Sequence, residues 1–540
     1  MSLESTVAEV AIKQNLEQFL IVLSVSLSVA TISRIFSWFR KIPYTLLLVI
    51  VGLGLAFVNV RLVNLSPELI LEIFLPPLLF EAAWNIRWRN LRENLVPVSL
   101  FAVLGVVISV LGIALAVSYF TKLSLPIALL LGASLAATDP VSVIALFREL
   151  GAGKRLTVVM EGESLFNDGV AVVAFLLLVG IPLGTQQFSM SATIAQFFTF
   201  VGIGIGVGGL IGFGISYLTQ RFDLPLVEQS LTLVSAYGTY LIAEELGGSG
   251  VIAVVVVGLI LGNFGSRIGM NPRTRLIVSE FWDFLAFFVN SIVFLLIGDQ
   301  IQFASLARNL DLIGVAIAAV VLTRLIAIFG LGTISNWITQ NNLDWRQQTV
   351  LWWGGLRGSV SIALALSVPT LLQGRQEIID AVFGVVLFTL LVQGLTTQFL
   401  LENLNLIGGQ RQKQQYAEAI ARRTALTRIL QYLAELETAE RKETADDDSD
   451  RAEFIRYQQG LVKGQLKGIE EEMTRLQRQN ADLLSLELEQ LREQLLDIEA
   501  DTYAEFIRAG RLKNNLSPLL QEVMDEAMER TIVENVGQKG

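Results

Sequence analysis

Long apolar runs recur along the first 400 residues of the chain, and each is close to the length that a helix needs to cross a bilayer. Short polar segments, many of them with arginine or lysine, separate the runs. The pattern predicts an all-α polytopic membrane protein with thirteen transmembrane helices. The spans fall near residues 16–33, 43–60, 69–84, 95–120, 124–147, 156–181, 193–219, 225–245, 249–264, 279–298, 307–338, 347–372 and 377–400.

The chain becomes polar and densely charged after the last apolar run. Residues 1–400 hold 21 Lys+Arg and 23 Asp+Glu, whereas residues 401–540 hold 19 and 27. We therefore expect a transmembrane domain over residues 1–405 and a soluble helical tail over residues 406–540, with a solvated acidic linker at 446–450. A heptad pattern in the tail predicts helix pairing, either in a coiled coil or in a compact helical domain. It runs through Val462, Leu466, Ile469, Met473, Leu476, Asn480 and Leu483, and then shifts phase to Leu484, Leu488, Leu491, Leu495 and Ile498.

Basic residues are unevenly divided between the two sides of the predicted bundle. The loops that follow odd-numbered spans contain fourteen Lys and Arg residues, and the opposite side contains five. By the positive-inside rule the richer side is cytoplasmic. We expect a multi-pass protein of the plasma (inner) membrane with its N-terminus outside and its tail in the cytoplasm.

Composition excludes several kinds of chemistry. Cysteine and histidine are both absent, which removes disulfides, thiolate nucleophiles, His-ligated zinc or haem and imidazole proton relays. Proton chemistry must therefore run on carboxylates, and no cofactor is expected. The net charge of −10 resides mainly in the tail and argues against a nucleic-acid partner.

The sixth span contains a polar face. Glu163 and Asn167 are four residues apart, as are Ser164 and Asp168, so a helix carries the two pairs as adjacent stripes. Hard cations prefer carboxylate, hydroxyl and amide oxygens of this kind, and a carboxylate that binds a cation can also bind a proton. Because charges at membrane depth are costly, the face predicts an ion pathway rather than a simple helix contact.

Two other spans are expected to be interrupted. Pro140 follows Thr138 and Asp139 in the fifth span, which favours unwound backbone beside a cavity. The twelfth span has three glycines around Arg357, whose permanent charge needs an acidic partner, for which Glu163 is the candidate. If the first span is set aside, spans five and twelve occupy corresponding positions in two six-helix halves of opposite orientation. This correspondence indicates inverted repeats, as in secondary transporters.

Three further features carry less weight. The Gly-rich stretch 204–209 has a formal GxGxxG pattern, but an apolar helix with no preceding soluble strand favours small-xxx-small helix packing instead. Glu81 follows a double proline in the third span, and Arg324 lies within the eleventh. Both are charges at membrane depth and thus candidates for the pathway.

Five segments in this order resemble the sodium/proton antiporters of the NhaP type and their animal relatives: FLPPLLFEAAW, ATDPVSV, EGESLFNDG, FVNSIVFLLIG and WGGLRGSVSIALAL. The resemblance implies a homodimer in which a core domain moves against a dimer domain. It implies that Asp168 alternately holds cation and proton, and that Ser164, Thr138 and Glu81 are further cation ligands. It also implies a structural Glu163–Arg357 ion pair, with Asn167 and Asp139 shaping the crossing and Arg324 neutralising nearby acids or a helix end.

The expected activity is exchange of sodium or lithium for protons, electroneutral at one for one, by alternating access and competition for one carboxylate. Such a protein would serve pH homeostasis and salt tolerance. Potassium or calcium exchange for protons stays open as an alternative, and a gated cation channel is less favoured. An intramembrane aspartyl hydrolase using Asp139 and Asp168 is disfavoured because the sequence lacks a GxGD-type motif. The tail could bind a regulatory partner, or make the chain a sensor.

Overall fold

The computed structural model consists entirely of helices and their connections within the residues it describes. These are 3–35, 42–58, 62, 65–185, 189–219, 224–266, 270, 272–339, 343–407, 410–443, 450–479, 495, 498, 499, 502 and 506. The chain divides into two compact units. The first comprises Met1–Leu406 with Tyr503–Asn515, and the second comprises Ile407–Thr502 with Leu516–Gly540.

The helices of the first unit follow the apolar runs of the sequence, and every predicted span overlaps at least one of them. In the described part of the chain, six helical segments are long and apolar enough to cross a membrane. The helices are α1 (Leu3–Ile35), α2 (Tyr44–Phe57), α3 (Leu75–Asn85), α4 (Trp88–Glu93), α5 (Leu95–Ser99), α6 (Gly105–Phe120), α7 (Leu125–Ala136), α8 (Val141–Leu150), α9 (Lys154–Leu178), α10 (Met190–Thr219), α11 (Pro225–Glu245), α12 (Gly250–Ile260), α14 (Pro272–Asp299), α15 (Phe303–Arg308), α16 (Leu310–Ile338), α17 (Trp345–Trp353), α18 (Ser359–Leu366), α19 (Arg375–Phe388) and α20 (Leu395–Asn403). Among the described residues, π-helical turns adjoin them at η2 (Leu69–Phe74), η3 (Leu100–Leu104), η4 (Leu261–Gly265) and η5 (Thr389–Gly394).

Two of the apolar runs are broken where the sequence carries proline or glycine. Helix α7 ends at Ala136 and α8 begins at Val141, because Pro140 cannot donate a helical hydrogen bond and restricts the residue before it. Helix α17 ends at Trp353 and α18 begins at Ser359, across a glycine-rich segment. The backbone amide of Asp139 in one break donates to the carbonyl of Leu356 in the other, at 2.8 Å.

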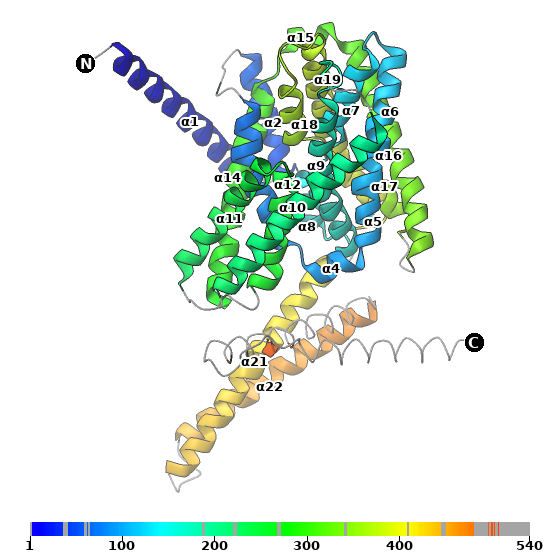
Figure 1. Cartoon of the computed structure of the whole chain (residues 1–540). Coiled ribbons are helices and arrows are strands. Elements are labelled where there is room, and N and C mark those ends of the chain that lie inside the picture. The colour runs from blue at the N-terminus through cyan, green and yellow to red at the C-terminus, as the bar shows by residue number, and fades with distance from the viewer. Residues whose placement is uncertain are drawn as a thin grey trace. The chain divides into compact units, whose positions relative to one another are not determined.

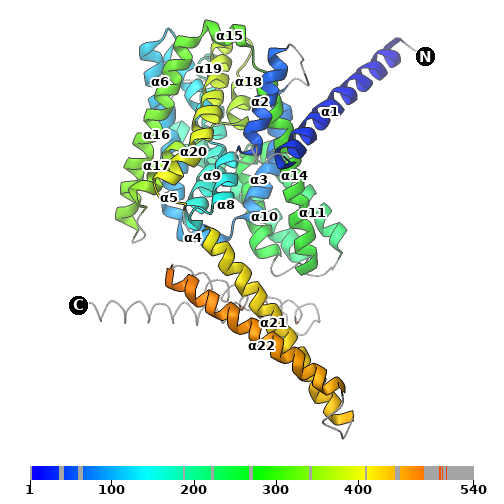
Figure 2. The same ribbon diagram turned by 180° about the vertical axis from the view of Figure 1, so that it is seen from behind.

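Helix α9 runs through the interior of the first unit. Both views show it surrounded by other helices of the unit, with α7 and α8 beside it (Figures 1 and 2). Most of its residues between Leu156 and Leu177 are buried, including Glu163, Ser164, Asn167 and Asp168. A polar side chain on this helix therefore needs a partner from a neighbouring element.

The glycines of α10 pack against α12. A Cβ atom built on Gly204 would lie 2.8 Å from the carbonyl oxygen of Ser249, and one on Gly208 would lie 2.5 Å from that of Ala253. One on Gly212 would lie 3.1 Å from side-chain atoms of Ile260. Only glycine allows this approach, so the predicted small-xxx-small packing is confirmed for Gly204, Gly208 and Gly212. Of the glycines in the GxGxxG pattern only Gly204 makes such a contact, because a Cβ atom on Gly206 or Gly209 would meet no described atom within 4 Å.

The second unit contains an antiparallel pair of helices, α21 (Gln410–Glu443) and α22 (Asp450–Gln479), which lie side by side in both views (Figures 1 and 2). Near one end Gln477 donates to the hydroxyl of Tyr416, and near the other Gln459 donates to Glu437 at 3.0 Å. The first part of the predicted heptad run is buried or half-buried against α21, where Met473 and Leu476 pack on Tyr416. Residues 446–449 of the predicted acidic linker lie outside the described residues, and its last residue, Asp450, begins α22 instead. Asn480, Leu483, Leu484, Leu488 and Leu491 of the heptad run also lie outside the described residues.

Candidate functional site

The two chain breaks, residues 137–140 and 354–358, bring together the ends of α7, α8, α17 and α18, and we call this region the crossing. An arginine caps each of the two C-terminal ends. Arg357 Nη1 donates to the carbonyls of Ala136 and Ala137, both at 2.9 Å, at the end of α7. Arg324 Nη2 donates to Leu351 O at 3.0 Å, and its Nε donates to Trp352 O at 3.2 Å, at the end of α17. The guanidinium groups satisfy carbonyls that have no intrahelical partner and oppose the negative end of each helix dipole.

Asp139 caps the two N-terminal ends. Its carboxylate accepts a hydrogen bond from the backbone amide of Val141 at 3.2 Å, at the start of α8. It also accepts from the backbone amide of Ser359, at the start of α18. A Cβ atom on Gly358 would lie 2.1 Å from Asp139 Oδ2, so glycine is needed for this approach. Asp139 thus binds the two interrupted spans to each other.

The predicted polar face of α9 points at one of these breaks. Glu163, Ser164, Asn167 and Asp168 are all buried. Ser164 Oγ donates to the carbonyl of Thr138 at 2.6 Å, and Asn167 Nδ2 donates to Thr138 Oγ1 at 3.2 Å. The structure therefore brings together five of the residues that the sequence singled out.

The predicted ion pair between Glu163 and Arg357 is wrong. Glu163 instead pairs with Arg324, whose Nη1 and Nη2 donate to Glu163 Oε1 and Oε2 at 3.0 Å each. Gly355 makes room for this arginine, because a Cβ atom there would lie 1.9 Å from Arg324 Nε. Arg357 is turned toward the end of α7, which occupies its Nη1.

Asp168 differs from the other buried acids of this site. Its side chain is 8% exposed, and its Oδ1 atom has no hydrogen-bond partner among the described residues. The charges that act on it are those of Asp139, Glu163 and Arg357. Arg357 is fully buried, and its Nε and Nη2 groups likewise have no partner in the described part of the chain. A carboxylate oxygen and two guanidinium donors thus retain hydrogen-bonding capacity at the centre of the crossing.

Glu81 belongs to a different group of charges. It accepts from Asn85 at 2.6 Å, and the same amide donates to Asp283 at 3.1 Å. The other charges that act on Glu81 are those of Arg148 and Glu161, which form an ion pair at 2.9 Å. Glu81 therefore has hydrogen-bonding neighbours different from those of Ser164 and Thr138.

Two polar residues of the crossing, Thr389 and Ser361, were not predicted from the sequence. Thr389 Oγ1 accepts from the backbone amide of Arg357 at 3.1 Å, and Ser361 Oγ donates to Ala137 O at 3.3 Å. Both lie in apolar runs where a single hydroxyl gives no signal of its own. The sequence analysis also did not identify Asp380, a buried acid away from the crossing. It accepts from Ser305, Asn309 and Gln376.

Interrupted helices whose ends meet around buried charges are typical of secondary transporters, which place their ion sites at such breaks. The arrangement defines a membrane transport protein, in which the carboxylate, hydroxyl and carbonyl oxygens of the crossing suit a small hard cation.

Comparisons with known proteins identify the family. The family model described as "Sodium/hydrogen exchanger, transmembrane" matches residues 24–403. The Na(+)/H(+) antiporter ApNhaP of Aphanothece halophytica is 70% identical over 525 residues, covering 97% of this chain and 99% of that protein. The low-affinity Na(+)/H(+) antiporter NhaS1 of Synechocystis is 63% identical over 514 residues, covering 94% and 96%. The solved structure of the antiporter MjNhaP1 of Methanocaldococcus jannaschii is 21% identical, with a TM-score of 0.60, and the match covers 73% of this chain and 99% of that one.

The chain belongs to the sodium/hydrogen exchanger family, and the resemblance seen in the sequence is confirmed. It is a secondary active transporter of the sodium/proton antiporter class and not an enzyme. The likeness to the archaeal structure shows an all-helical multi-pass membrane fold.

Proposed function

We propose that Asp168 is the carboxylate that holds the transported sodium ion and the proton in turn. The observation that carries this proposal is its buried Oδ1 atom, which has no hydrogen-bond partner in the described residues. By contrast, the carboxylates of Glu163 and Asp139 are engaged by Arg324 and by helix amides. A buried carboxylate that forms no ion pair is energetically costly, so binding a cation or a proton stabilises it.

Neutral oxygens next to Asp168 complete the proposed cation site. Ser164 precedes it by one helical turn, and the Ser164 hydroxyl bonds to the carbonyl of Thr138, which lies in unwound backbone. Oxygen ligands from a hydroxyl, a carbonyl and a carboxylate fit sodium or lithium. Glu81 is the third proposed ligand beyond Asp168, and its position among Asn85 and Asp283 suits a stage of the ion's entry.

The exchange is proposed to be electroneutral. Asn167 stands beside Asp168 where a second acid would add another negative charge, so the crossing offers one carboxylate to the cargo. The loaded site then carries the same charge with one sodium ion or one proton. The membrane potential, worth about 2.3 kcal/mol per charge per 100 mV, would therefore not drive the exchange.

Alternating access completes the proposed cycle. We infer thirteen spans built as inverted six-helix repeats after an initial helix, with the core that carries both breaks moving against a dimer domain in a homodimer. The excess of basic residues after odd-numbered spans supports an external N-terminus and a cytoplasmic tail in the plasma membrane. Residues 1–405 would form the transport domain and residues 406–540 a regulatory tail that binds a partner. A chain that ends near residue 410 should then retain exchange but lose its regulation.

Asp168→Asn tests the central assignment. The amide cannot exchange a proton for a cation, so sodium-dependent proton movement in sealed vesicles should fall to the level of protein-free vesicles. The matched control is Asp380→Asn, which makes the same change at a buried acid held by Ser305, Asn309 and Gln376. Exchange that survives in the Asp168 variant would contradict the proposal, provided that both variants are recovered folded.

The ion and the stoichiometry are tested in the same vesicles. Sodium, lithium, potassium and calcium are supplied in turn, and the proton movement that each elicits ranks the cargo. A current during exchange under voltage clamp would contradict one-for-one exchange. Loss of a proton gradient without any counter-ion would indicate a gated channel instead.

A further inference from the structure

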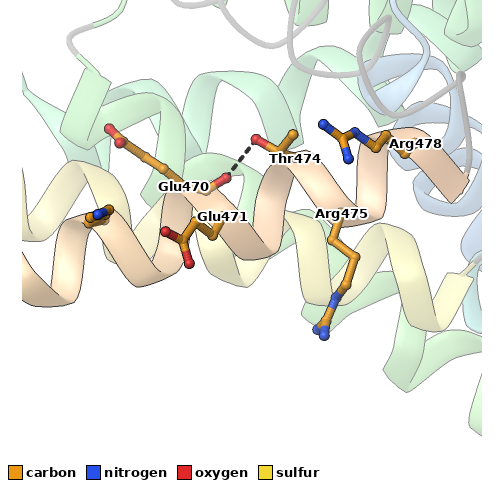
Figure 3. A pocket seen from close by; sticks show the side chains of 6 residues that line it. Glu470, Glu471, Thr474, Arg475 and Arg478 are labelled. Carbon is orange, nitrogen blue, oxygen red and sulfur yellow. Dashed lines mark hydrogen bonds between the residues drawn. The ribbon is translucent and has the colours of Figure 1, made fainter.

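Helix α22 has an outer face, which we define as residues 453, 457, 460, 464, 467, 468, 471 and 475. Apart from the adjacent pair 467 and 468, these positions recur every three or four residues, and all are exposed. Met473 and Leu476, which pack on α21, lie on the opposite side of the helix. Figure 3 shows Glu471 and Arg475 extending from one side of α22, where they belong to a mixed set of acidic and basic side chains that line a pocket.

Three glycines mark the middle of this face. A Cβ atom built on Gly460, Gly464 or Gly468 would meet no described atom within 4 Å. Glycine is the weakest helix former after proline, and the packing of the described residues does not explain its repeated use at these exposed positions. The glycines of α10 have the same four-residue spacing, and there α12 fills the space.

The charges of the outer face are complementary to themselves under a two-fold rotation. If two copies of α22 cross antiparallel with Gly464 on the axis, Gly460 of one copy faces Gly468 of the other. Glu453 then lies opposite Arg475, and this pairing occurs twice by symmetry. A parallel crossing in the same register would instead set Glu453 against Glu453 and Arg475 against Arg475.

We propose that the outer face of α22 binds the α22 of a second copy of this chain, antiparallel and centred on Gly464. The glycines let the two backbones approach closely, as at the contact between α10 and α12. Tyr457 and Leu461, which are 63% and 50% exposed, flank the glycines and become covered.

A cysteine at the two-fold axis tests this arrangement in the full chain within membrane vesicles. The chain contains no cysteine, so Gly464→Cys gives each copy one thiol. Antiparallel crossing places the two thiols within the Cα separation of about 4.4–6.8 Å that a disulfide requires. Mild oxidation should therefore convert most of the protein to a covalent dimer that reduction reverses.

Two controls separate this contact from chance collision. Gly460→Cys places the thiols eight residues apart along an antiparallel pair, about 12 Å, and should not cross-link with itself. Ala425→Cys, at an exposed position of α21, should not cross-link either. No cross-linking of Gly464→Cys, or equal cross-linking at all three positions, would overturn the proposal.

Charge reversal gives a second readout in the Gly464→Cys background. Glu453→Arg alone and Arg475→Glu alone each convert two attractive pairs to repulsive ones and should slow cross-linking roughly fivefold to tenfold. The two changes together restore opposite charges and should restore the rate. If the double variant is as slow as the single ones, the predicted pairing is wrong.

Discussion

Arg324 and Arg357 are both buried arginines that cap a helix end at the crossing, but their charges are balanced differently. Arg324 forms a two-point ion pair with Glu163 and also bonds carbonyls of α17. Arg357 bonds carbonyls of α7, while its Nε and Nη2 groups have no partner in the described residues. The charge of Arg324 is neutralised by Glu163, whereas the charge of Arg357 acts on Asp168, the proposed cargo carboxylate.

We infer that this difference separates a structural charge, Arg324, from a charge that acts on the proposed cargo carboxylate, Arg357. A buried ion pair with fork geometry holds its two helices together whatever the site carries. The charge of Arg357 acts on Asp168, whose own charge changes when a proton binds. We therefore expect variants at Glu163 and Arg324 to affect stability first, and variants at Arg357 to affect ion binding as well.

The largest effect on stability is predicted for Glu163→Gln. Gln cannot neutralise Arg324, which is left as an uncompensated charge 7% exposed among apolar helices. Breaking a buried pair in this way costs about 3–5 kcal/mol. The yield of folded protein and the thermal unfolding midpoint in detergent should both fall sharply.

The double variant Glu163→Gln with Arg324→Gln is the matched control for that prediction. It removes both charges together and should recover much of the lost stability, because no unpaired charge is left. If the double variant is as unstable as the sum of its single changes, the ion pair seen in the structure does not couple the two residues.

Arg357→Ala is predicted to have the next largest effect, and of a different kind. The carbonyl of Ala136 loses its charged donor, which costs about 1.5–3 kcal/mol, whereas Ala137 keeps the hydroxyl of Ser361. Removing a positive charge beside Asp168 should also strengthen sodium binding. The sodium concentration for half-maximal exchange should fall several-fold in vesicles. An unchanged value would place Arg357 with Arg324 as a purely structural group.

A smaller effect is predicted for Gly355→Ala. The added methyl group would lie 1.9 Å from Arg324 Nε, so the guanidinium must shift and weaken its pair with Glu163. Overpacking of this kind costs about 1–3 kcal/mol. Gly206→Ala, at a helical position with open space around it, should leave the unfolding midpoint unchanged or raise it. Equal behaviour of the two variants would contradict a tight fit around Arg324.

Local features of this fold could be predicted from the sequence, whereas the pairing across helices could not. The apolar helices and the breaks at Pro140 and Gly354 are determined by residues that are close together in the sequence, so the sequence alone predicts them. Which arginine reaches Glu163 depends on how α16 and the break before α18 pack beside α9. Arg324 lies in an unbroken apolar span, and nothing in its neighbours indicates that it, rather than Arg357, meets the acid.

The smallest effect is predicted for Ser164→Ala, and it distinguishes a proposed cation ligand from a residue that only contributes a structural hydrogen bond. Ser164→Ala removes the hydroxyl that bonds to Thr138 O at 2.6 Å and should cost about 1 kcal/mol of stability. Ser142→Ala removes a bond of the same length, to Thr45, and should cost a similar amount. Because Ser164 is a proposed cation ligand, its variant alone should raise the sodium concentration for half-maximal exchange. If both variants lower stability equally and neither changes the sodium dependence, Ser164 positions the Thr138 carbonyl without touching the ion.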